Sequence, residues 1–400
     1  MMNELIRFLE EVRKFPIDNK RIIRDEDSRR ERIYEYIEHT VSEDQVRIKR
    51  IEFVEIKLNE QPKGYLEIYA IDSSSRVIDT PYIFLAIGAA TIINRIKGYI
   101  LDYPNIYHVL NNYDLKYKYA VIIPEVSNYP LEILDKLERK GVTNKNPIGI
   151  QYTPKYSKYV VLDELRLGLE NTILEKTLQE SSIRDSYIFI DGPIYYTPPL
   201  VYQLNEFHGV KDELLNVYVE SWKYLIEKRV NLIDKLYKER NIIVLGVVKR
   251  LYRSNILSRI DPLRVSNGNI NDEAYLSIVS TIRYQELTPK PFYIGPIIYD
   301  PGRITIKLPS KKLYYIGLPR RQVAGRTDYR NYMFYRVETI HGDDESLNPI
   351  IYDSIYSGSI LPLSILLADN RAKKITNGML NYLLRITNLP TDHTYQYITF

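Results

Sequence analysis

The chain has 400 residues, 44% of them hydrophobic, so it is long enough to bury a sizeable core as one large domain or two ordinary ones. Its 55 basic and 51 acidic residues give a net charge of only +4, which excludes a histone-like mode of DNA binding but allows a basic groove on a mixed surface. The chain has no cysteine, which excludes disulfides, zinc ribbons and cysteine nucleophiles.

Residues 1–60 are rich in charge and predict a helical extension, and we expect residues 61–400 to form one domain behind it. The start, MMNELIRFLEEVRKFP, is amphipathic and carries acids, unlike a signal peptide, and no apolar run reaches the roughly 18 residues of a membrane helix. The cysteine-free composition, rich in charged and β-branched residues, favours a thermophile. We therefore expect a soluble, cytoplasmic protein without membrane contact.

Strands and helices alternate from residue 65 onward. Apolar runs typical of buried strands lie at 65–72, 81–93, 118–126, 187–194 and 241–250. Helical patterns span 163–180, 212–240 and 361–386. Four further segments with a more antiparallel character lie at 291–299, 303–308, 312–318 and 332–340. This order predicts an α/β fold, a mixed β-sheet core flanked by helices with additional antiparallel strands.

Two aspartates follow apolar strands at the centre of this pattern. Asp72 ends YLEIYAID and Asp191 follows YIFI, which predicts a carboxylate at the C-terminal end of each buried strand, where open α/β sheets bind ligands. Either aspartate alone also fits an Asx-turn, but its recurrence in the same setting favours a site. HExxH, GxxxxGK[ST] and GxSxG motifs are absent. Two carboxylates without histidine or cysteine select Mg²⁺ or Mn²⁺.

A third acid is expected from the helix before Asp191. Its apolar arc leaves Glu164 and Glu175 on the opposite, solvent-facing side, whereas Glu170 lies at the edge of the arc, where its side chain can reach over the sheet. Glu170 is therefore our candidate. An ion pair with Arg166, one turn earlier, explains the same position equally well.

Basic residues that suit phosphate follow the strand at 241–250. Lys249 ends this strand, where its ammonium would steady a phosphate or developing charge, although a surface lysine fits the position as well. The later segment 319–336 mixes Arg with Tyr, as surfaces that bind single strands do, although exposed basic loops are common. The selected DNA-contact residues are Arg250, Arg253, Arg326, Arg330 and Tyr332.

Five short motifs follow one another along the chain. They are AIDSSS at 70–75, the RxxxE helix of Arg166 and Glu170, FIDGPI at 189–194, LGVVKR at 245–250 and PLSILLADNRAKKI at 362–375. In order and spacing this set resembles the NurA nuclease family, known from archaea and bacteria, over roughly residues 60–380. The Asp-Gly-Pro after an apolar strand, followed by Gly-Val-x-Lys after a long helix, is its most specific part.

The resemblance implies a ribonuclease-H-like fold and Mn²⁺- or Mg²⁺-dependent cleavage of DNA, as a 5′–3′ exonuclease with single-strand endonuclease action also open. It also implies a homodimer that works on single- and double-stranded DNA ends with a hexameric HerA-type translocase in end resection and repair. By position, Asp72, Glu170 and Asp191 match the family's metal-binding acids, and Lys249 matches its lysine.

One segment departs from the family pattern. The family usually has Tyr-Pro followed by Ala-His near its C-terminus, whereas this chain reads SILPLSILLADN, with Asp369 in the histidine's place and the tyrosine lost near Leu361. Asp369 can still bind a metal, but it cannot act as an imidazole near pH 7. Two alternatives therefore stay open: a catalytically weakened subunit that threads DNA or regulates a HerA-like ring, and a ribonuclease on the same core.

Overall fold

The computed structural model describes residues 4, 7, 46–47, 51–56, 67–80, 83–111, 113–124, 131–196, 213–265, 270–284, 289–301, 307–319, 332–356 and 361–387. Within them, the strands form one mixed sheet in the order β1-β10-β11-β12-β9-β8-β3-β4-β6-β7, with β2 paired to β10 and β5 to β4. The strands are β1 Val46–Arg47, β2 Glu52–Glu55, β3 Ile68–Asp79, β4 Ile83–Asn94, β5 Tyr99–Tyr103, β6 Ala120–Pro124, β7 Val142–Thr143, β8 Ser186–Asp191, β9 Ile242–Val248, β10 Phe292–Tyr299, β11 Lys311–Pro319 and β12 Tyr332–Thr339. The helices are α3 Ile106–Leu110, α4 Leu131–Arg139, α5 Lys158–Gln179, α7 Glu213–Arg240, α8 Ile256–Ile260, α9 Asp272–Tyr284, α10 Asn348–Tyr356 and α11 Leu363–Thr387, with short 3₁₀ turns η4 Leu251–Arg253 and η6 Asp344–Leu347.

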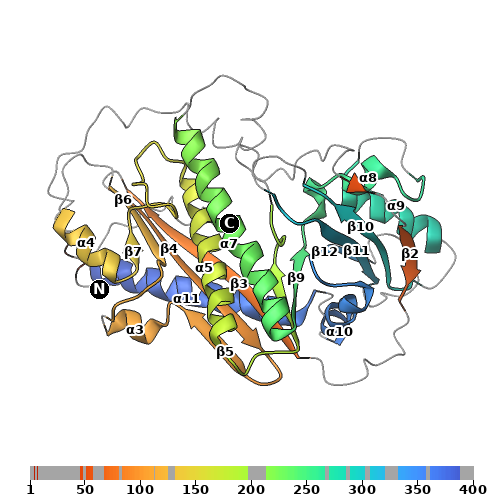
Figure 1. Ribbon diagram of the computed structural model, residues 1–400, viewed down its shortest axis with the longest axis horizontal. Helices are drawn as coiled ribbons and strands as arrows, with labels where there is room; N and C mark the ends of the chain where they lie inside the picture. The colour runs from red at the N-terminus through yellow and green to blue at the C-terminus, as the bar shows by residue number, and fades with distance from the viewer. Residues whose placement is uncertain are drawn as a thin grey trace.

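The central strands are covered on both faces. β3 pairs antiparallel with β4 and parallel with β8, which in turn pairs parallel with β9. Helices α5 and α7 lie over one face of this region and α11 crosses the other (Figure 1). All twelve residues of β4 are buried, as expected for a strand covered on both faces. The predicted mixed α/β fold is therefore confirmed.

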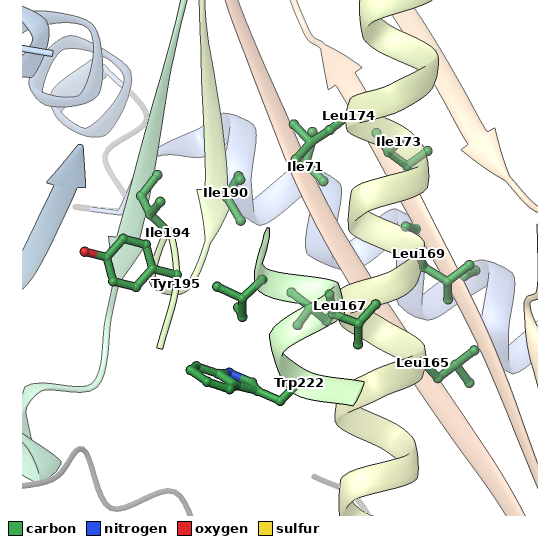
Figure 2. Packing of buried hydrophobic residues seen from close by; sticks show 14 of the residues in the cluster. Ile71, Leu165, Leu167, Leu169, Ile173, Leu174, Ile190, Ile194, Tyr195 and Trp222 are labelled. Carbon is green, nitrogen blue, oxygen red and sulfur yellow. The ribbon is translucent and has the colours of Figure 1, made fainter. Parts of the chain in front are cut away.

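Helix α5 packs closely on the sheet because β4 has a glycine, Gly88, where the two meet. A Cβ added at Gly88 would lie 2.5 Å from Leu169 Cδ1 and 3.1 Å from Leu165 Cγ, so glycine lets the helix approach. Figure 2 shows the side chains of this layer, with Ile71 of β3 and Ile190 of β8 in the same cluster as the α5 leucines.

The second face of α5 is also buried, under α7. Glu164, which the sequence analysis placed toward solvent, is only 6% exposed, and its carboxylate accepts hydrogen bonds from the hydroxyls of Tyr152 at 2.6 Å and Tyr156 at 2.8 Å. That prediction was wrong because a single apolar arc was assumed for a helix that is covered on two sides.

The far half of the sheet is antiparallel. Strands β10, β11 and β12 follow one another and join the central strands where β12 pairs with β9. The core residues of α9 and of α10 fall in different clusters, on opposite faces of these strands (Figure 1). The strand expected at 303–308 lies largely outside the described residues.

The predictions of a helical segment at residues 1–60 and of no membrane helix can be compared with the described residues. β1 and β2 belong to the sheet, so the helical pattern predicted for residues 1–60 does not hold at these two strands; most other residues of this range lie outside the description. Among the described helices, none combines the length and the hydropathy that crossing a membrane requires.

Candidate functional site

Asp72 and Asp191 are neighbours in the sheet. Ile71 of β3 lies opposite Ile190 of β8 in a parallel ladder, so the next residues along, the two aspartates, are also adjacent. Because side chains alternate across a strand and Ile71 and Ile190 point into the α5 layer (Figure 2), both carboxylates lie on the α11 face. One detail of the prediction was wrong: β3 continues to Asp79, so Asp72 lies inside a strand rather than at its end.

The two carboxylates have different partners. Asp72 is 7% exposed, and its Oδ1 accepts a hydrogen bond from the backbone N–H of Ser73 at 2.7 Å. Asp191 Oδ2 accepts one from the Lys249 ammonium at 2.6 Å. Burial, and then the negative charge of Asp191, raise the pKa of Asp72 well above its usual value; burial also raises the pKa of Asp191, against the lowering effect of Lys249.

Asp369 reaches the same face from above the sheet. It lies on α11 next to the fully buried Ala368, and its negative charge contributes to the raised pKa of both Asp72 and Asp191. Its own carboxylate is paired with Lys373, 2.8 Å away and one turn along the helix. Of the other predicted residues, Lys249 contacts Asp191 directly, and Asp369 is near enough for its charge to act on both strand aspartates.

Glu170 approaches from the other face of the sheet. Its Oε1 accepts a hydrogen bond from the Ser73 hydroxyl at 2.5 Å, and its Oε2 is held by the guanidinium of Arg229 on α7. Arg166, considered as its partner from the sequence, donates to Asp163 at 2.8 Å. The negative charge of Glu170 still raises the pKa of Asp72 and of Asp191, so it belongs to the same electrostatic cluster.

The chemistry of this cluster suits a hard divalent cation. Its donors are carboxylate oxygens, which Mg²⁺ and Mn²⁺ prefer, and crowding of buried carboxylates is relieved by a bound cation. Within the described ranges, no three acidic or histidine side chains already stand at metal-ligand spacing. Asp72 and Asp191 supply the right kind of donor for such a cation from adjacent strands, whereas Glu170 is engaged by Ser73 and Arg229 and Asp369 by Lys373.

Two glycines shape the turn that follows Asp191. Gly192 has a φ of +116°, a conformation that favours glycine, and its N–H donates to Val247 O at 3.0 Å. A Cβ at Gly246 would lie 2.7 Å from both Gly192 O and Ile194 N, so only glycine lets the turn lie against β9. The Asp-Gly-Pro and Gly-Val-x-Lys motifs are thus in direct contact.

A buried charge network holds this turn in place. Glu338, fully buried on β12, accepts a hydrogen bond from Ile194 N at 3.2 Å. The same carboxylate pairs with Lys311 at 2.5 Å and Arg336 at 2.8 Å. The network therefore fixes the turn next to the catalytic candidate Asp191.

The DNA-contact candidates have separate outcomes. Arg250 is exposed beside Lys249, and the Arg253 guanidinium lies 5.4 Å from the centre of the Tyr252 ring. Tyr332 is buried in β12, where its hydroxyl donates to Lys290 O at 2.9 Å, so its ring is not presented for base stacking and that prediction is corrected. Arg326 and Arg330 lie outside the described residues.

Comparison with known families identifies the chain. The model of the NurA domain matches residues 66–374, which include both strand aspartates, Glu170, Lys249 and Asp369. The chain belongs to the NurA family. No curated protein matches the chain.

Solved NurA structures are similar at low sequence identity. The NurA nuclease from Sulfolobus solfataricus is 13% identical with a TM-score of 0.40, covering 98% of this chain and 96% of that one. A structure of NurA with manganese is 13% identical with a TM-score of 0.41, covering 81% and 89%. A structure of NurA bound to dAMP and manganese is 11% identical with a TM-score of 0.41, covering 79% and 86%.

Sequence reasoning missed Arg229 although a signal was present. Within the NurA match, Arg229 interrupts an apolar stripe of α7 at helical spacing, and its side chain is 3% exposed. A buried arginine requires an acidic partner, which is Glu170. No local signal identified Asp102, which reaches this face from β5 and pairs with Arg371 of α11.

Proposed function

We propose that this chain is a divalent-metal-dependent deoxyribonuclease that hydrolyses phosphodiester bonds at DNA ends, as a 5′–3′ exonuclease and as a single-strand endonuclease. The observation that carries the proposal is the adjacent pair Asp72 and Asp191 on one face of the sheet, with Asp369 beside them. Membership of the NurA family supports the choice of a nuclease.

The residues take distinct roles in this proposal. Asp72 and Asp191 would hold Mn²⁺ or Mg²⁺, with Glu170 as the third ligand and Asp369 as the replacement for the family's histidine. The cation would supply Lewis acidity and an activated water. Lys249 holds Asp191 Oδ2 and brings a positive charge to the carboxylates, where it would contact the scissile phosphate.

The wider setting is proposed from the family. The hairpin β3-β4, whose first strand pairs parallel with β8, and the parallel pair of β8 with β9 support a ribonuclease-H-like core. Arg250 and Arg253, with Arg326 and Arg330, would follow the DNA strand. The protein would act in the cytoplasm as a homodimer with a HerA-like hexameric ATPase during DNA end resection.

Asp72→Asn tests the site directly. The amide is a poorer cation ligand, so we expect cleavage of single- and double-stranded DNA in Mn²⁺ to fall by more than about 100-fold, beyond the loss typical of outer-shell partners. The matched control is Asp79→Asn on the same strand, which removes only the partly exposed ion pair with Lys158. Equal activity in both variants and the unaltered protein would contradict the assignment.

A weakened, non-catalytic subunit is the second candidate. Its support is Asp369, which replaces the expected histidine and is paired with Lys373. It predicts DNA binding without cleavage in Mn²⁺ or Mg²⁺, and restoration of cleavage by Asp369→His would favour it over a site defect elsewhere. Matched RNA substrates in the same assay distinguish a ribonuclease.

A further inference from the structure

A polar row runs across the sheet beside the carboxylates. Thr91 of β4 lies opposite Asp72 of β3 on one side and opposite Asp102 of β5 on the other. The Thr91 hydroxyl, fully buried, donates to Asp102 Oδ1 at 2.7 Å. All three side chains therefore lie on the α11 face, and two strand spacings of about 4.8 Å separate Asp72 from Asp102 by about 10 Å.

Arg371 closes this row from α11. Its Nε donates to Asp102 Oδ1 at 2.7 Å and its Nη2 to Asp102 Oδ2 at 2.5 Å, which is a bidentate pair. A guanidinium has five N–H donors, so three remain. The arginine side chain is 41% exposed, and within the described part of the chain Asp102 is its only hydrogen-bonding partner. The guanidinium thus has a fixed orientation and unused donors at the surface.

We propose that Arg371, oriented by Asp102 and Thr91, binds a phosphodiester group of the DNA strand next to the carboxylates; this inference rests on the proposed nuclease function. Planar guanidinium suits two phosphate oxygens at once. The span of about 10 Å equals the rise of roughly three stacked nucleotides, so the bound phosphate would belong to the strand whose cleavage the carboxylates support.

The ion pair with Asp102 determines how Arg371 can contribute to DNA binding. Asp102 neutralises its charge, so the pair adds little long-range attraction but keeps the guanidinium in one rotamer. Arg371 is on the opposite flank of α11 from Asp369, which faces the two strand aspartates. DNA held on that flank would approach the acids from the β5 side. A purely structural tie between α11 and β5 is the competing explanation.

Binding of a fluorescein-labelled oligodeoxynucleotide, measured by anisotropy in EDTA over a salt series, tests the site without cleavage. We expect Arg371→Ala to weaken binding about tenfold and to reduce the salt slope by less than about 0.7, the value for one unpaired cation on a single-strand phosphate, because Asp102 already neutralises Arg371. The matched control is Lys374→Ala, which removes an exposed charge of the same sign from the same helix. Its effect should be much smaller.

The double variant Arg371→Ala with Asp102→Asn separates position from charge, because its net charge equals that of the unaltered protein. Binding should stay weak in the double variant, and Asp102→Asn alone should lower kcat without raising KM, since the charge remains but its orientation is lost. If Arg371→Ala binds like the unaltered protein and only its melting temperature falls, the pair is a structural tie and the proposal is overturned.

The outcomes also separate this site from the nuclease itself. An unaltered protein that binds DNA through Arg371 but cleaves nothing in Mn²⁺ retains the phosphate site and rejects the proposed function. An unaltered protein that cleaves DNA, with Arg371→Ala indistinguishable from it in binding and in KM, rejects the phosphate site alone. An unaltered protein that binds no DNA in EDTA also rejects the phosphate site, whereas the nuclease is judged by cleavage in Mn²⁺ alone.

Discussion

Glu164 is a buried carboxyl group whose titration should be visible in the stability of the protein. It lies between α5 and α7, where two tyrosine hydroxyls donate to it. Burial raises its pKa from 4.5 to about 7, against the lowering effect of these hydrogen bonds. Replacing it by glutamine keeps the size and removes the titration; only one of the two tyrosine hydroxyls can still donate to the side chain, a loss that is the same at every pH.

The sign of the effect follows from the folded-state pKa. Since the folded protein holds this proton more tightly than the unfolded chain, the contribution of Glu164 to stability is full below pH 4.5 and is lost as the pH rises through about 7. The pKa rise from 4.5 to about 7 is about 2.5 units, and one unit corresponds to about 1.36 kcal/mol. The free-energy difference across this window is therefore roughly 3 kcal/mol.

Urea unfolding of the unaltered protein and of Glu164→Gln at pH 4.5 and pH 8.5 measures this difference. The variant should gain stability relative to the unaltered protein by roughly 3 kcal/mol between the two pH values. Glu175→Gln on the same helix is the control. Burial raises the pKa of Glu175, but hydrogen bonds from Lys228 and Tyr117 lower it by more, so the net pKa is lowered and the contribution of Glu175 to stability is lost as the pH falls. A pH-independent difference for Glu164→Gln would refute the reasoning.

Two further predictions concern the turn after Asp191. Glu338→Gln removes the carboxylate that pairs with the buried Lys311 and Arg336, so urea unfolding should show a loss of about 3–5 kcal/mol; a loss below about 1 kcal/mol would mean that the network contributes little. Gly246→Ala forces a Cβ against backbone atoms of the turn, so it should cost about 1–3 kcal/mol and reduce DNA cleavage, whereas Gly168→Ala, with 3.9 Å to the nearest side-chain atom, should stabilise the protein by about 0.5–1 kcal/mol. Unchanged cleavage by a folded Gly246→Ala protein would separate the turn from the site.

The strand aspartates could be predicted from sequence because their setting is local. Apolar runs before Asp72 and Asp191 mark buried strands, and parallel neighbours bring equivalent positions together. The continuation of β3 beyond Asp72 was missed, since Ser73, Ser74 and Ser75 look like the start of a loop. Their strand conformation is provided by β4, which pairs with all three.

Contacts between distant segments were the larger gap. Glu164 looked exposed because a helical wheel shows one apolar arc, whereas the covering α7 comes later in the chain. The pair Arg371 and Asp102 joins residues 269 positions apart, and neither interrupts an apolar pattern. Only the sheet register shows that Asp102 shares a row with Asp72.

The four carboxylates differ in how many neighbouring charges repel or neutralise them. Asp191, Asp369 and Glu170 each have a basic side chain within ion-pair distance. Asp72, within the described residues, has only the Ser73 N–H as hydrogen-bond donor, while Asp191, Glu170 and Asp369 all add repulsion. Because a divalent ion would relieve this repulsion at Asp72 first, we infer that cation affinity depends more steeply on Asp72 than on the acids that already have a basic partner.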